Sequence, residues 1–538
     1  MHSLLSKLHL PFQRQWPKWQ FHLFASALIL FVNNGAFYKI LLESYPWTDY
    51  PLFVISVSVL ALMVTYLLLQ ILALLIPDKW AAILLVCTAS ASSYFSSQFG
   101  IIFDQDMIRN LFATDARESA DLFSASLLIH LTITAAIPCT ILAKLALYKV
   151  PRITWLKHNA VSFITTLAVC LVTVLPQSAQ FASFFREHKA IRYQLTPVTP
   201  LVSLFKYAGK VASANAHESF QTLVSYADIP EEDPNRELII VVVGETARAD
   251  HFSLNGYSRN TNPHLSQEDN LISFTHIEAC GTSTAISVPC LFALSGEDKF
   301  DADTSKYQQN ILDIAAEAGV RVLWRDNNSD SKGVATRVPY EDFRSPEVNP
   351  LCDPECRDIG MLSGLQEYIN ASHQDTLIIL HQMGSHGPAY AKRYPKEFET
   401  FTPACQSAEL NQCSQQEIIN AYDNSLVYTD YFLSQTIALL RSNSDKFQTS
   451  MFYVGDHGES LGENGVYLHG MPRFLAPEAQ THVPFIVWTD KGSDIDIAGT
   501  KLRHDKASSH DAFAATLLES FEIESDAVLK APSLLVRK

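Results

Sequence analysis

Acidic and histidine side chains follow two apolar runs that lie far apart in the chain. Glu245 comes just after the run 238–243, and the pair Asp456-His457 follows the run 450–454. Such runs predict buried parallel strands, which deliver the side chains at their ends to the edge of an open sheet where ligands bind. This mixture of oxygen and nitrogen ligands suits zinc best. The sequence therefore predicts a metal-dependent enzyme.

The segment between Cys280 and Cys290 offers a hydroxyl group to the same site. It begins with glycine and several hydroxyl residues, and a helix is predicted to follow. A helix N-terminus presents free N–H groups to an anion, and a hydroxyl that touches a metal ion there becomes a better nucleophile. An ordinary Ser or Thr helix cap is the alternative interpretation, although a bridge between the two cysteines would hold the loop rigidly and favour catalysis.

Histidines occur near two of the predicted strand ends. His386 and His469 lie in glycine-rich loops beyond strands, at the sheet edge that we expect to hold the metal, so they are candidates for catalysis. His381 is closer to its strand and is expected to be a packed or hydrogen-bonded residue. Lys332 lies in a polar loop, where it could contact a phosphate oxygen or simply be solvated.

Length and charge limit the class of protein. A chain of 538 residues is too long for one compact core, so two or more domains are expected. The net charge of −16 argues against a nucleic acid as partner, because phosphate binding needs a positive surface.

The first third of the chain contains five apolar stretches that could cross a bilayer, which takes about 20 residues. They cover residues 21–41, 52–76, 80–103, 122–147 and 161–179. Buried helices of a soluble domain are the alternative, but five such stretches in succession are rare in soluble cores. A cleaved signal peptide is disfavoured, because the first stretch is too long and lacks a small-residue cleavage pattern.

Basic residues near the ends of the spans predict their orientation. Those on the side of the N-terminus are Lys7, Arg14, Lys18, Lys79, Lys149, Arg152 and Lys157. The opposite loops are mainly acidic and contain Glu43, Asp49, Asp104, Asp106, Asp115 and Glu118. We therefore expect a cytoplasmic N-terminus. An odd number of spans then places the chain after about residue 180 on the outer side of the membrane.

The cysteines agree with an oxidising compartment for the last part of the chain. Of nine cysteines, three lie inside apolar spans, where a free thiol acts as a small hydrophobe. The other six fall in three close couples, which predict the disulfides Cys280–Cys290, Cys352–Cys356 and Cys405–Cys413. A zinc cluster is a weaker alternative for them, because the sequence has no CxxC knuckle.

The apolar patterns divide the chain into three regions. We expect a helical transmembrane domain at residues 1–180, a linker at 181–235 with an interfacial amphipathic helix over 201–224, and a catalytic domain at 236–538. In the last region, apolar runs at 238–243, 320–324, 376–381, 450–454 and 483–488 alternate with helical patterns at 308–318, 360–368 and 416–441. This alternation predicts parallel strands in a sheet covered by helices on both faces.

Several motifs in combination resemble one known family. They are Gly244-Glu-Thr-Ala-Arg248 with Asn255-Gly-Tyr257, Cys280-Gly-Thr-Ser-Thr-Ala285 with Ser287-Val-Pro-Cys290, Trp324-Arg-Asp-Asn-Asn328, Gly384-Ser-His-Gly-Pro388 and Gly455-Asp-His-Gly-Glu-Ser-Leu-Gly-Glu-Asn-Gly465. They are similar to those of the lipid A phosphoethanolamine transferases, which include the mobile colistin-resistance enzymes. The likeness covers the whole chain. It implies five spans followed by an α/β soluble domain of the alkaline-phosphatase and sulfatase type.

The resemblance also implies a metal centre. Thr284 matches the nucleophile that carries phosphoethanolamine and completes the zinc tetrahedron. The other zinc ligands match Glu245, Asp456 and His457. His386 and His469 match residues that line the substrate phosphate and sometimes hold a second zinc ion, so we expect one zinc ion or two.

Further residues match contacts to the donor lipid. Ser329 and Lys332 match headgroup contacts in the soluble domain. The membrane-domain residues that hold the ethanolamine side match Asn110, Thr114 and Glu118, in the outer loop after the third span. Position 286 is Ile, where many relatives have an aromatic residue, so we expect the shape of the pocket to differ there.

The function implied is a transfer in two displacements at Thr284. Phosphatidylethanolamine donates phosphoethanolamine to the hydroxyl, and a lipid A phosphate then takes it. We expect His386 or His469 to protonate the departing alkoxide. The product would be modified lipopolysaccharide and resistance to polymyxins, including colistin. We expect a monomer among the lipids of the bacterial inner membrane, with its catalytic domain in the periplasm.

Three other functions are alternatives to lipid A modification. Within enzymes, the alternative is transfer of phosphoethanolamine or phosphoglycerol to another acceptor, such as a core sugar of lipopolysaccharide or a periplasmic glucan. A sulfatase is disfavoured, because the Cys-x-Pro-x-Arg maturation motif is absent from the sequence. A non-catalytic membrane scaffold is disfavoured by the intact set of metal-ligand types.

Overall fold

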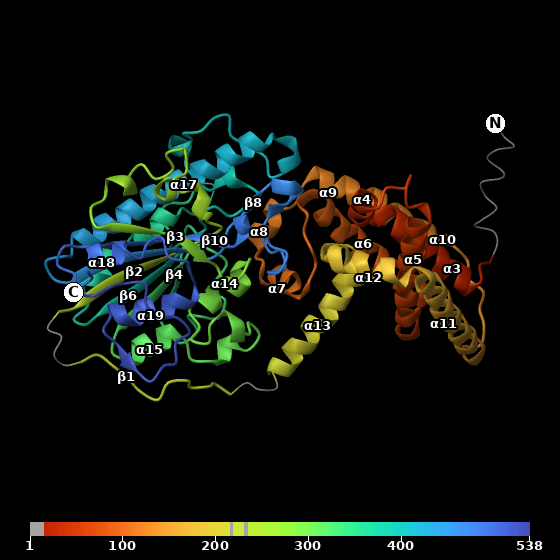
Figure 1. The fold of residues 1–538 in the computed structure, drawn as a ribbon, viewed down its shortest axis with the longest axis horizontal. Coiled ribbons are helices and arrows are strands. Elements are labelled where there is room, and N and C mark those ends of the chain that lie inside the picture. Colours follow the sequence, from red (N-terminus) through yellow and green to blue (C-terminus); the bar gives the residue numbers. More distant parts are fainter. Residues whose placement is uncertain (1–14, 216–218, 231–234, 354) are drawn as a thin grey trace. The chain divides into compact units, whose positions relative to one another are not determined.

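The computed structural model describes residues 15–538 apart from 216–218, 231–234 and 354 (Figure 1). The described chain forms two compact units. The first contains the chain up to Ile108 together with Phe123–Ala208, and the second contains Arg109–Leu122 together with Gly209–Lys538. The short segment Arg109–Leu122 therefore belongs with the C-terminal unit, although in sequence it lies between two apolar helices.

The first unit is helical. Its apolar helices are α3 (Lys18–Asn33), α4 (Gly35–Ser44), α5 (Pro51–Leu75), α6 (Asp78–Phe99), α9 (Ala125–Leu131), α10 (Ile137–Lys144), α11 (Arg152–Val174) and α12 (Ser178–Glu187). Within the described residues, four helical stretches are long and apolar enough to cross a membrane, and the bent pair α3–α4 would make a fifth. This agrees with the predicted spans. Ile164, Leu171 and Val172 on α11 are largely exposed, as expected for side chains that face lipid.

The predicted amphipathic helix of the linker is displaced toward the N-terminus. The helix α13 spans Val198–Asn215 instead of 201–224, and residues 216–218 lie outside the described part. Two further short helices, α7 (Gln105–Ala113) and α8 (Ala116–Asp121), lie between α6 and α9 in sequence. Of these, α8 lies wholly within the segment that belongs to the second unit.

The second unit contains an eight-stranded sheet in the order β11-β3-β10-β7-β2-β6-β4-β5. Its strands are β2 (Glu237–Gly244), β3 (Leu271–Glu278), β4 (Arg321–Asp326), β5 (Tyr340–Asp342), β6 (Thr376–His381), β7 (Gln448–Gly455), β10 (His482–Thr489) and β11 (Ser508–Ser509). The central strand β2 is buried at every position and pairs in parallel with β6 and β7. An unbroken apolar run suits this place, because both faces of the strand are covered.

Helices cover both faces of this sheet. They are α14 (Thr284–Leu291), α15 (Ile311–Glu317), α16 (Leu365–Asn370), α17 (Gln415–Arg441), α18 (Ile497–Lys501) and α19 (Asp511–Ser520). Figure 1 shows α17 on one side of the sheet and α15 and α19 on the other. The predicted helices 308–318 and 416–441 correspond to α15 and α17, whereas 360–368 is divided into a 3-10 turn (Asp358–Leu362) and α16.

The prediction that residues 483–488 form a parallel strand was wrong. This strand, β10, runs antiparallel to both of its neighbours, β7 and β3. A fully buried strand has the same apolar run in either direction, so the pattern cannot show direction. The chain between β7 and β10 contains the hairpin β8 (Ser460–Leu461) and β9 (Tyr467–Leu468) instead of a crossover helix, which is compatible with an antiparallel return.

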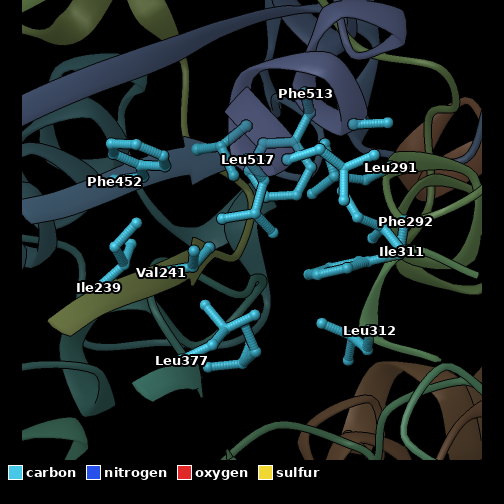
Figure 2. Packing of buried hydrophobic residues seen from close by; sticks show 14 of the residues in the cluster. Ile239, Val241, Leu291, Phe292, Ile311, Leu312, Leu377, Phe452, Phe513 and Leu517 are labelled. Atoms are coloured by element: carbon cyan, nitrogen blue, oxygen red, sulfur yellow. The ribbon is translucent and has the colours of Figure 1, made fainter. Parts of the chain in front are cut away.

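One continuous hydrophobic cluster supports the sheet on the side of α14, α15 and α19. Figure 2 shows Val241 of β2 and Phe452 of β7 among side chains from these helices, including Phe292 next to α14 and Leu517 of α19. The alternate residues of β2 face α14, α15 and α19, so burial fixes the register of the strand. Because β2 and β7 both belong to this packed sheet, the core also fixes where the residues that follow these strands lie.

Candidate active site

The two strands β2 and β7 place three metal-ligating side chains together. The strands pair in parallel with Gly244 opposite Gly455, so Glu245 and Asp456 follow at neighbouring points of the same edge. One ligand atom from each of Glu245, Asp456 and His457 lies within 4.8 Å of the others. All three residues are almost fully buried.

The hydrogen bonds of this cluster leave one acceptor atom of each of the three residues directed toward the other two. His457 Nδ1 donates to the carbonyl of Gly458 at 2.9 Å, which leaves Nε2 as an acceptor. That Nε2 lies 3.4 Å from Glu245 Oε1 and 3.3 Å from Asp456 Oδ2. Both of these buried oxygens have no hydrogen-bond partner among the described residues. Three converging acceptors without a donor are the arrangement that a divalent cation satisfies.

Burial also shifts the pKa values of these three side chains. Burial, followed by the charge of Asp456, raises the pKa of Glu245. Burial also raises the pKa of Asp456 to about 7, and lowers that of His457 to about 4. Without a bound cation, burial therefore disfavours the ionised forms of these groups. A bound cation would stabilise the carboxylates and the neutral imidazole, which are the forms that bind metal.

Thr284 is the first residue of α14, and its hydroxyl enters the same cluster. Its Oγ1 donates to Glu245 Oε2 at 3.0 Å and lies 3.2 Å from His457 Nε2. The disulfide between Cys280 and Cys290 joins the preceding loop to α14, as predicted. The hydroxyl therefore lies both beside the acceptor cluster and at a helix N-terminus, which favours an anionic ligand.

A second group of possible ligands shares Glu245. One atom from each of Glu245, His386 and His469 lies within 4.8 Å of the others. His469 Nδ1 donates to Glu459 Oε2 at 2.8 Å, so its Nε2 is free to accept. Burial lowers the pKa of both histidines. They are therefore neutral near pH 7, and the structure brings both predicted histidines to this cluster of possible metal ligands.

Glu118 reaches this cluster from α8. Asp115 caps this helix by accepting from the backbone N–H groups of Arg117 and Glu118. Glu118 Oε1 lies 3.9 Å from His386 Nε2, and only 11% of its side chain is exposed. Burial raises its pKa to about 7, partly offset by the positive charge of Lys332. The cluster thus contains a carboxylate whose ionised form a cationic group would stabilise.

The other predicted donor contacts lie around Glu118. Lys332 Nζ donates to the carbonyls of Ala113 and Ser329, each at 3.2 Å, so this lysine holds the Glu118 segment as well as facing the site. Ser329 is buried next to Asn328. Asn110 and Thr114 lie on the same segment as Glu118, and the Thr114 hydroxyl donates to the Asn110 carbonyl at 2.8 Å.

His381 is a packed residue, as predicted. It is fully buried, and its Nδ1 lies 3.0 Å from Asp326 Oδ2.

The backbone that follows Glu245 has an unusual conformation. Thr246 has a φ of +51°, which is rare for a β-branched residue, and its N–H donates to Asp456 Oδ1 while its carbonyl accepts from Tyr422.

Several residues that support the ligands were missed by the sequence reasoning. Asn328 Nδ2 donates to Glu245 Oε2 at 2.7 Å. His510 accepts from Cys280 N–H at 3.3 Å and donates to the Gly455 carbonyl at 2.9 Å, which ties the loop before Thr284 to β7. Glu459 holds His469. Of these, Asn328 and Glu459 lie within the quoted motifs, so the motifs could have pointed to them, whereas no pattern marks His510.

Comparison with known proteins agrees with both units. A profile described as phosphoethanolamine transferase EptA/EptB matches residues 61–211, and the sulfatase profile matches residues 237–523. The chain is 41% identical to phosphatidylethanolamine transferase Mcr-1 of Escherichia coli, covering 92% of this chain and 93% of that protein. It is 36% identical to phosphoethanolamine transferase EptA of E. coli K12, covering 87% and 86% respectively.

Solved structures agree as well. The integral membrane lipooligosaccharide phosphoethanolamine transferase EptA of Neisseria meningitidis has 32% sequence identity and a TM-score of 0.87, covering 94% of this chain and 96% of that one. The periplasmic domain of phosphoethanolamine transferase EptC of Campylobacter jejuni has 39% identity and a TM-score of 0.52, covering 57% and 94%. The resemblance in the motifs is confirmed, and the chain is an integral membrane enzyme that belongs to the phosphoethanolamine transferase family.

Proposed function

We propose that this enzyme transfers phosphoethanolamine from phosphatidylethanolamine to a lipid A phosphate in a zinc-dependent reaction, through a covalent intermediate on Thr284. The observation that carries the proposal is the position of the Thr284 hydroxyl, 3.0 Å from Glu245 Oε2 and 3.2 Å from His457 Nε2 at the start of α14. The names of the relatives support the transferred group.

Glu245, Asp456, His457 and Thr284 are the residues that would hold the zinc ion. Their donor set fits, because two buried carboxylate oxygens have no hydrogen-bond partner in the described part of the chain and the imidazole presents its lone pair to them. Zinc at this place would lower the pKa of the Thr284 hydroxyl and withdraw charge from the phosphoryl oxygens. Glu245, His386 and His469 would hold a second ion if one binds.

The first displacement forms the bond between Thr284 Oγ1 and phosphorus and breaks the bond from phosphorus to diacylglycerol. Glu245 Oε2 is the nearest acceptor of the hydroxyl hydrogen. The N–H groups at the start of α14 would stabilise the charge on the phosphoryl oxygens. His386 and His469 border the cluster and are neutral near pH 7, so either would take up the proton that Thr284 gives to Glu245 and then donate it to the departing alkoxide.

The second displacement reverses the roles. A lipid A phosphate oxygen attacks phosphorus, and Thr284 Oγ1 leaves and regains its proton. Between the two steps the donor's ammonium group would pair with Glu118, which lies 3.9 Å from His386, while Lys332 lies on the same side for a phosphate oxygen. Dividing the transfer in this way lets two lipids use one site in turn.

A membrane-anchored enzyme suits this reaction, because donor and acceptor are both lipids. We place the second unit in the periplasm, in agreement with the orientation expected from the basic residues. Lipid A modified in this way carries less negative charge, so cells that express the protein are expected to be less susceptible to polymyxins.

Mass spectrometry of lipid A tests this proposal. Cells that express the wild type should gain phosphoethanolamine on lipid A, and cells that express Thr284→Ala should not. Modification of a core sugar or a periplasmic glucan, with lipid A unchanged, would establish the alternative acceptor. Modified lipid A in the Thr284→Ala strain would exclude the covalent route.

A further inference from the structure

Arg393 contacts two parts of the candidate site at once. Its guanidinium is almost fully buried, with 2% of the side chain exposed. Nε donates to the carbonyl of His386 at 2.6 Å, and Nη2 contacts Asp121 Oδ2 at 2.7 Å. Nη1 contacts Glu355 Oε2 at 2.5 Å. One rigid planar group therefore joins the loop of His386 to the segment that carries Glu118.

Other contacts hold the beginning and middle of that segment. Arg109 forms an ion pair with Asp303 at 2.7 Å. Arg117 Nη2 donates to the carbonyl of Asn328 at 2.9 Å. Neither contact involves the His386 loop. Among the contacts described for this segment, those that reach the chain after β6 are the 3.9 Å approach of Glu118 to His386 and the ion pairs of Asp121 with Arg393 and Lys392.

Arg393 is the stronger of the two cations at Asp121. Lys392 Nζ also lies 2.5 Å from the Asp121 carboxylate, but its side chain is 49% exposed. Solvent screens an exposed ion pair and reduces its strength. The buried guanidinium is desolvated, and its bond to the His386 carbonyl ties it to that loop. The Arg393 guanidinium therefore holds Asp121, and with it the end of α8, in a fixed position.

We propose that Arg393, through Asp121, is a positioning residue that fixes the separation of Glu118 from His386 and thereby selects the length of the donor headgroup. The inference rests on the proposed function, in which the donor's ammonium pairs with Glu118 and its phosphoryl group lies at Thr284 beside His386. If Glu118 binds the ammonium nitrogen and Thr284 binds the phosphorus, a fixed distance between them favours one length of the chain that joins these two atoms. An ethanolamine spacer then fits, whereas a propanolamine spacer does not.

The test breaks this connection without removing the guanidinium. Loss of Arg393 would leave Glu355 without its guanidinium and Asp121 with only the half-exposed Lys392, and this could unfold the unit. Asp121→Asn keeps the shape of the side chain and removes its charge. Glu355→Gln is the matched control, because it makes the same change at the same guanidinium on the side away from Glu118. Melting temperature and zinc content of both purified full-length variants show whether they fold and load metal.

The measurement is the rate of phosphoethanolamine labelling of Thr284 in mixed micelles of phosphatidylethanolamine or phosphatidylpropanolamine. We expect Asp121→Asn to raise the donor KM about tenfold, with kcat within about twofold, and to lose the preference for the shorter headgroup. Glu355→Gln should keep the wild-type KM and preference. Glu118→Gln combined with Asp121→Asn should be no worse than Glu118→Gln alone, because both changes remove one function.

Three results would overturn the inference. They are a wild-type KM and preference in Asp121→Asn, an equal loss in Glu355→Gln, and additive losses in the double variant. Failure of the wild type to label Thr284 with either lipid would instead contradict the proposed function itself. The two failures are therefore distinguishable in one set of assays.

Discussion

At the scale of single residues, the chemistry depends on how one hydroxyl is surrounded. Thr284 is 6% exposed, so few water molecules compete with a substrate for its oxygen. The acceptors Glu245 and His457 lie on one side of it, and the N–H groups of α14 lie next to it. A methyl group on the same carbon restricts the hydroxyl to few rotamers, which favours a fixed direction of attack.

Replacement of Thr284 separates the nucleophile from the rest of the site. Thr284→Ala should reduce transfer on the order of 10³-fold or more, because the covalent route needs this oxygen. Thr284→Ser should keep part of the activity, since it retains the oxygen and loses only the rotamer restriction. Transfer assays with purified protein measure both, and unchanged melting temperatures exclude misfolding. Equal activity of the Ala variant and the wild type would contradict the covalent mechanism.

The raised pKa of Glu118 predicts a pH dependence of donor use. Its carboxyl group has a pKa of about 7, and only the ionised form attracts the donor's ammonium. The donor KM should therefore rise as the pH falls through about 7, because protonation removes the charge. Glu118→Gln should have a high KM that does not change with pH over this range. A wild-type KM that is constant between about pH 6 and pH 8 would exclude this role.

The sequence predicted the residues that end buried strands better than those in loops. Glu245 and Asp456 follow apolar runs, so their common edge could be inferred from strand pairing. Asp121 and Arg393 are 272 residues apart, and each lies in a polar stretch with many other charged residues. Nothing local shows that two such groups meet, because the contact depends on the tertiary fold.

At the scale of secondary-structure elements, the loop before α14 fixes Thr284, the proposed nucleophile. The disulfide Cys280–Cys290 and the contacts of His510 hold it from two sides. Burial lowers the pKa of His510 to about 4, so it is neutral and can accept from the loop while donating to β7. The position of Thr284 is therefore set before substrate binds, which reduces the entropic cost of the reaction.

Removal of this disulfide should affect catalysis as well as stability. Replacing both Cys280 and Cys290 by Ser should reduce the free energy of unfolding by about 2–4 kcal/mol and also lower kcat, because the loop can move. The control is the pair Cys405 and Cys413, which closes a loop of similar length, 8 residues apart against 10. Its removal should destabilise the unit by a similar amount and leave kcat unchanged. Equal effects on kcat would show a role in stability only.

The loop after β6 packs closely on Glu245, a proposed metal ligand. Gly384 has a φ of +51°, and a Cβ at this position would lie 2.8 Å from the carbonyl oxygen of Glu245. Gly384→Ala should cost about 1–2 kcal/mol of stability through backbone strain and also displace Glu245, which lowers zinc affinity. Gly364→Ala adds the same strain at a position where the new Cβ would meet no described atom within 4 Å apart from its chain neighbours. It should leave zinc affinity unchanged, as metal titration can show.

The elements themselves could be predicted from periodicity, but not all of their connections. The central strands β2, β6 and β7 are continuous apolar runs, so they were found. The strand β3 alternates between buried and more exposed positions and was missed, and the direction of β10 was wrong. Direction depends on the chain between strands, which here contains a hairpin instead of a helix.

At the scale of the whole molecule, one chain combines a membrane-spanning unit with a soluble catalytic unit. The apolar helices of the first unit can remain among lipids, whereas the second unit has a soluble α/β core with three disulfides. The segment Arg109–Leu122 comes from the membrane part of the sequence but belongs to the catalytic unit. The predicted donor contacts in it are therefore held by the catalytic unit.

Removal of the metal should weaken the second unit selectively. A ligand present at about 100 times its Kd stabilises the folded state by about 2.7 kcal/mol, so exhaustive chelation should lower the melting temperature of the zinc-loaded enzyme. Activity should fall in parallel and return when zinc is added. His457→Ala should show the low melting temperature without chelation and no response to zinc. A chelated enzyme with full activity would exclude the metal from the mechanism.

The most direct test of the account is the covalent state of Thr284 during turnover. Wild-type enzyme is mixed with phosphatidylethanolamine in the absence of acceptor, quenched, digested and sequenced by mass spectrometry. We predict phosphoethanolamine on Thr284 in the zinc-loaded enzyme, its absence after chelation, and its disappearance when lipid A is added. Transfer that proceeds with Thr284 unmodified, or an adduct on another side chain, would contradict the account.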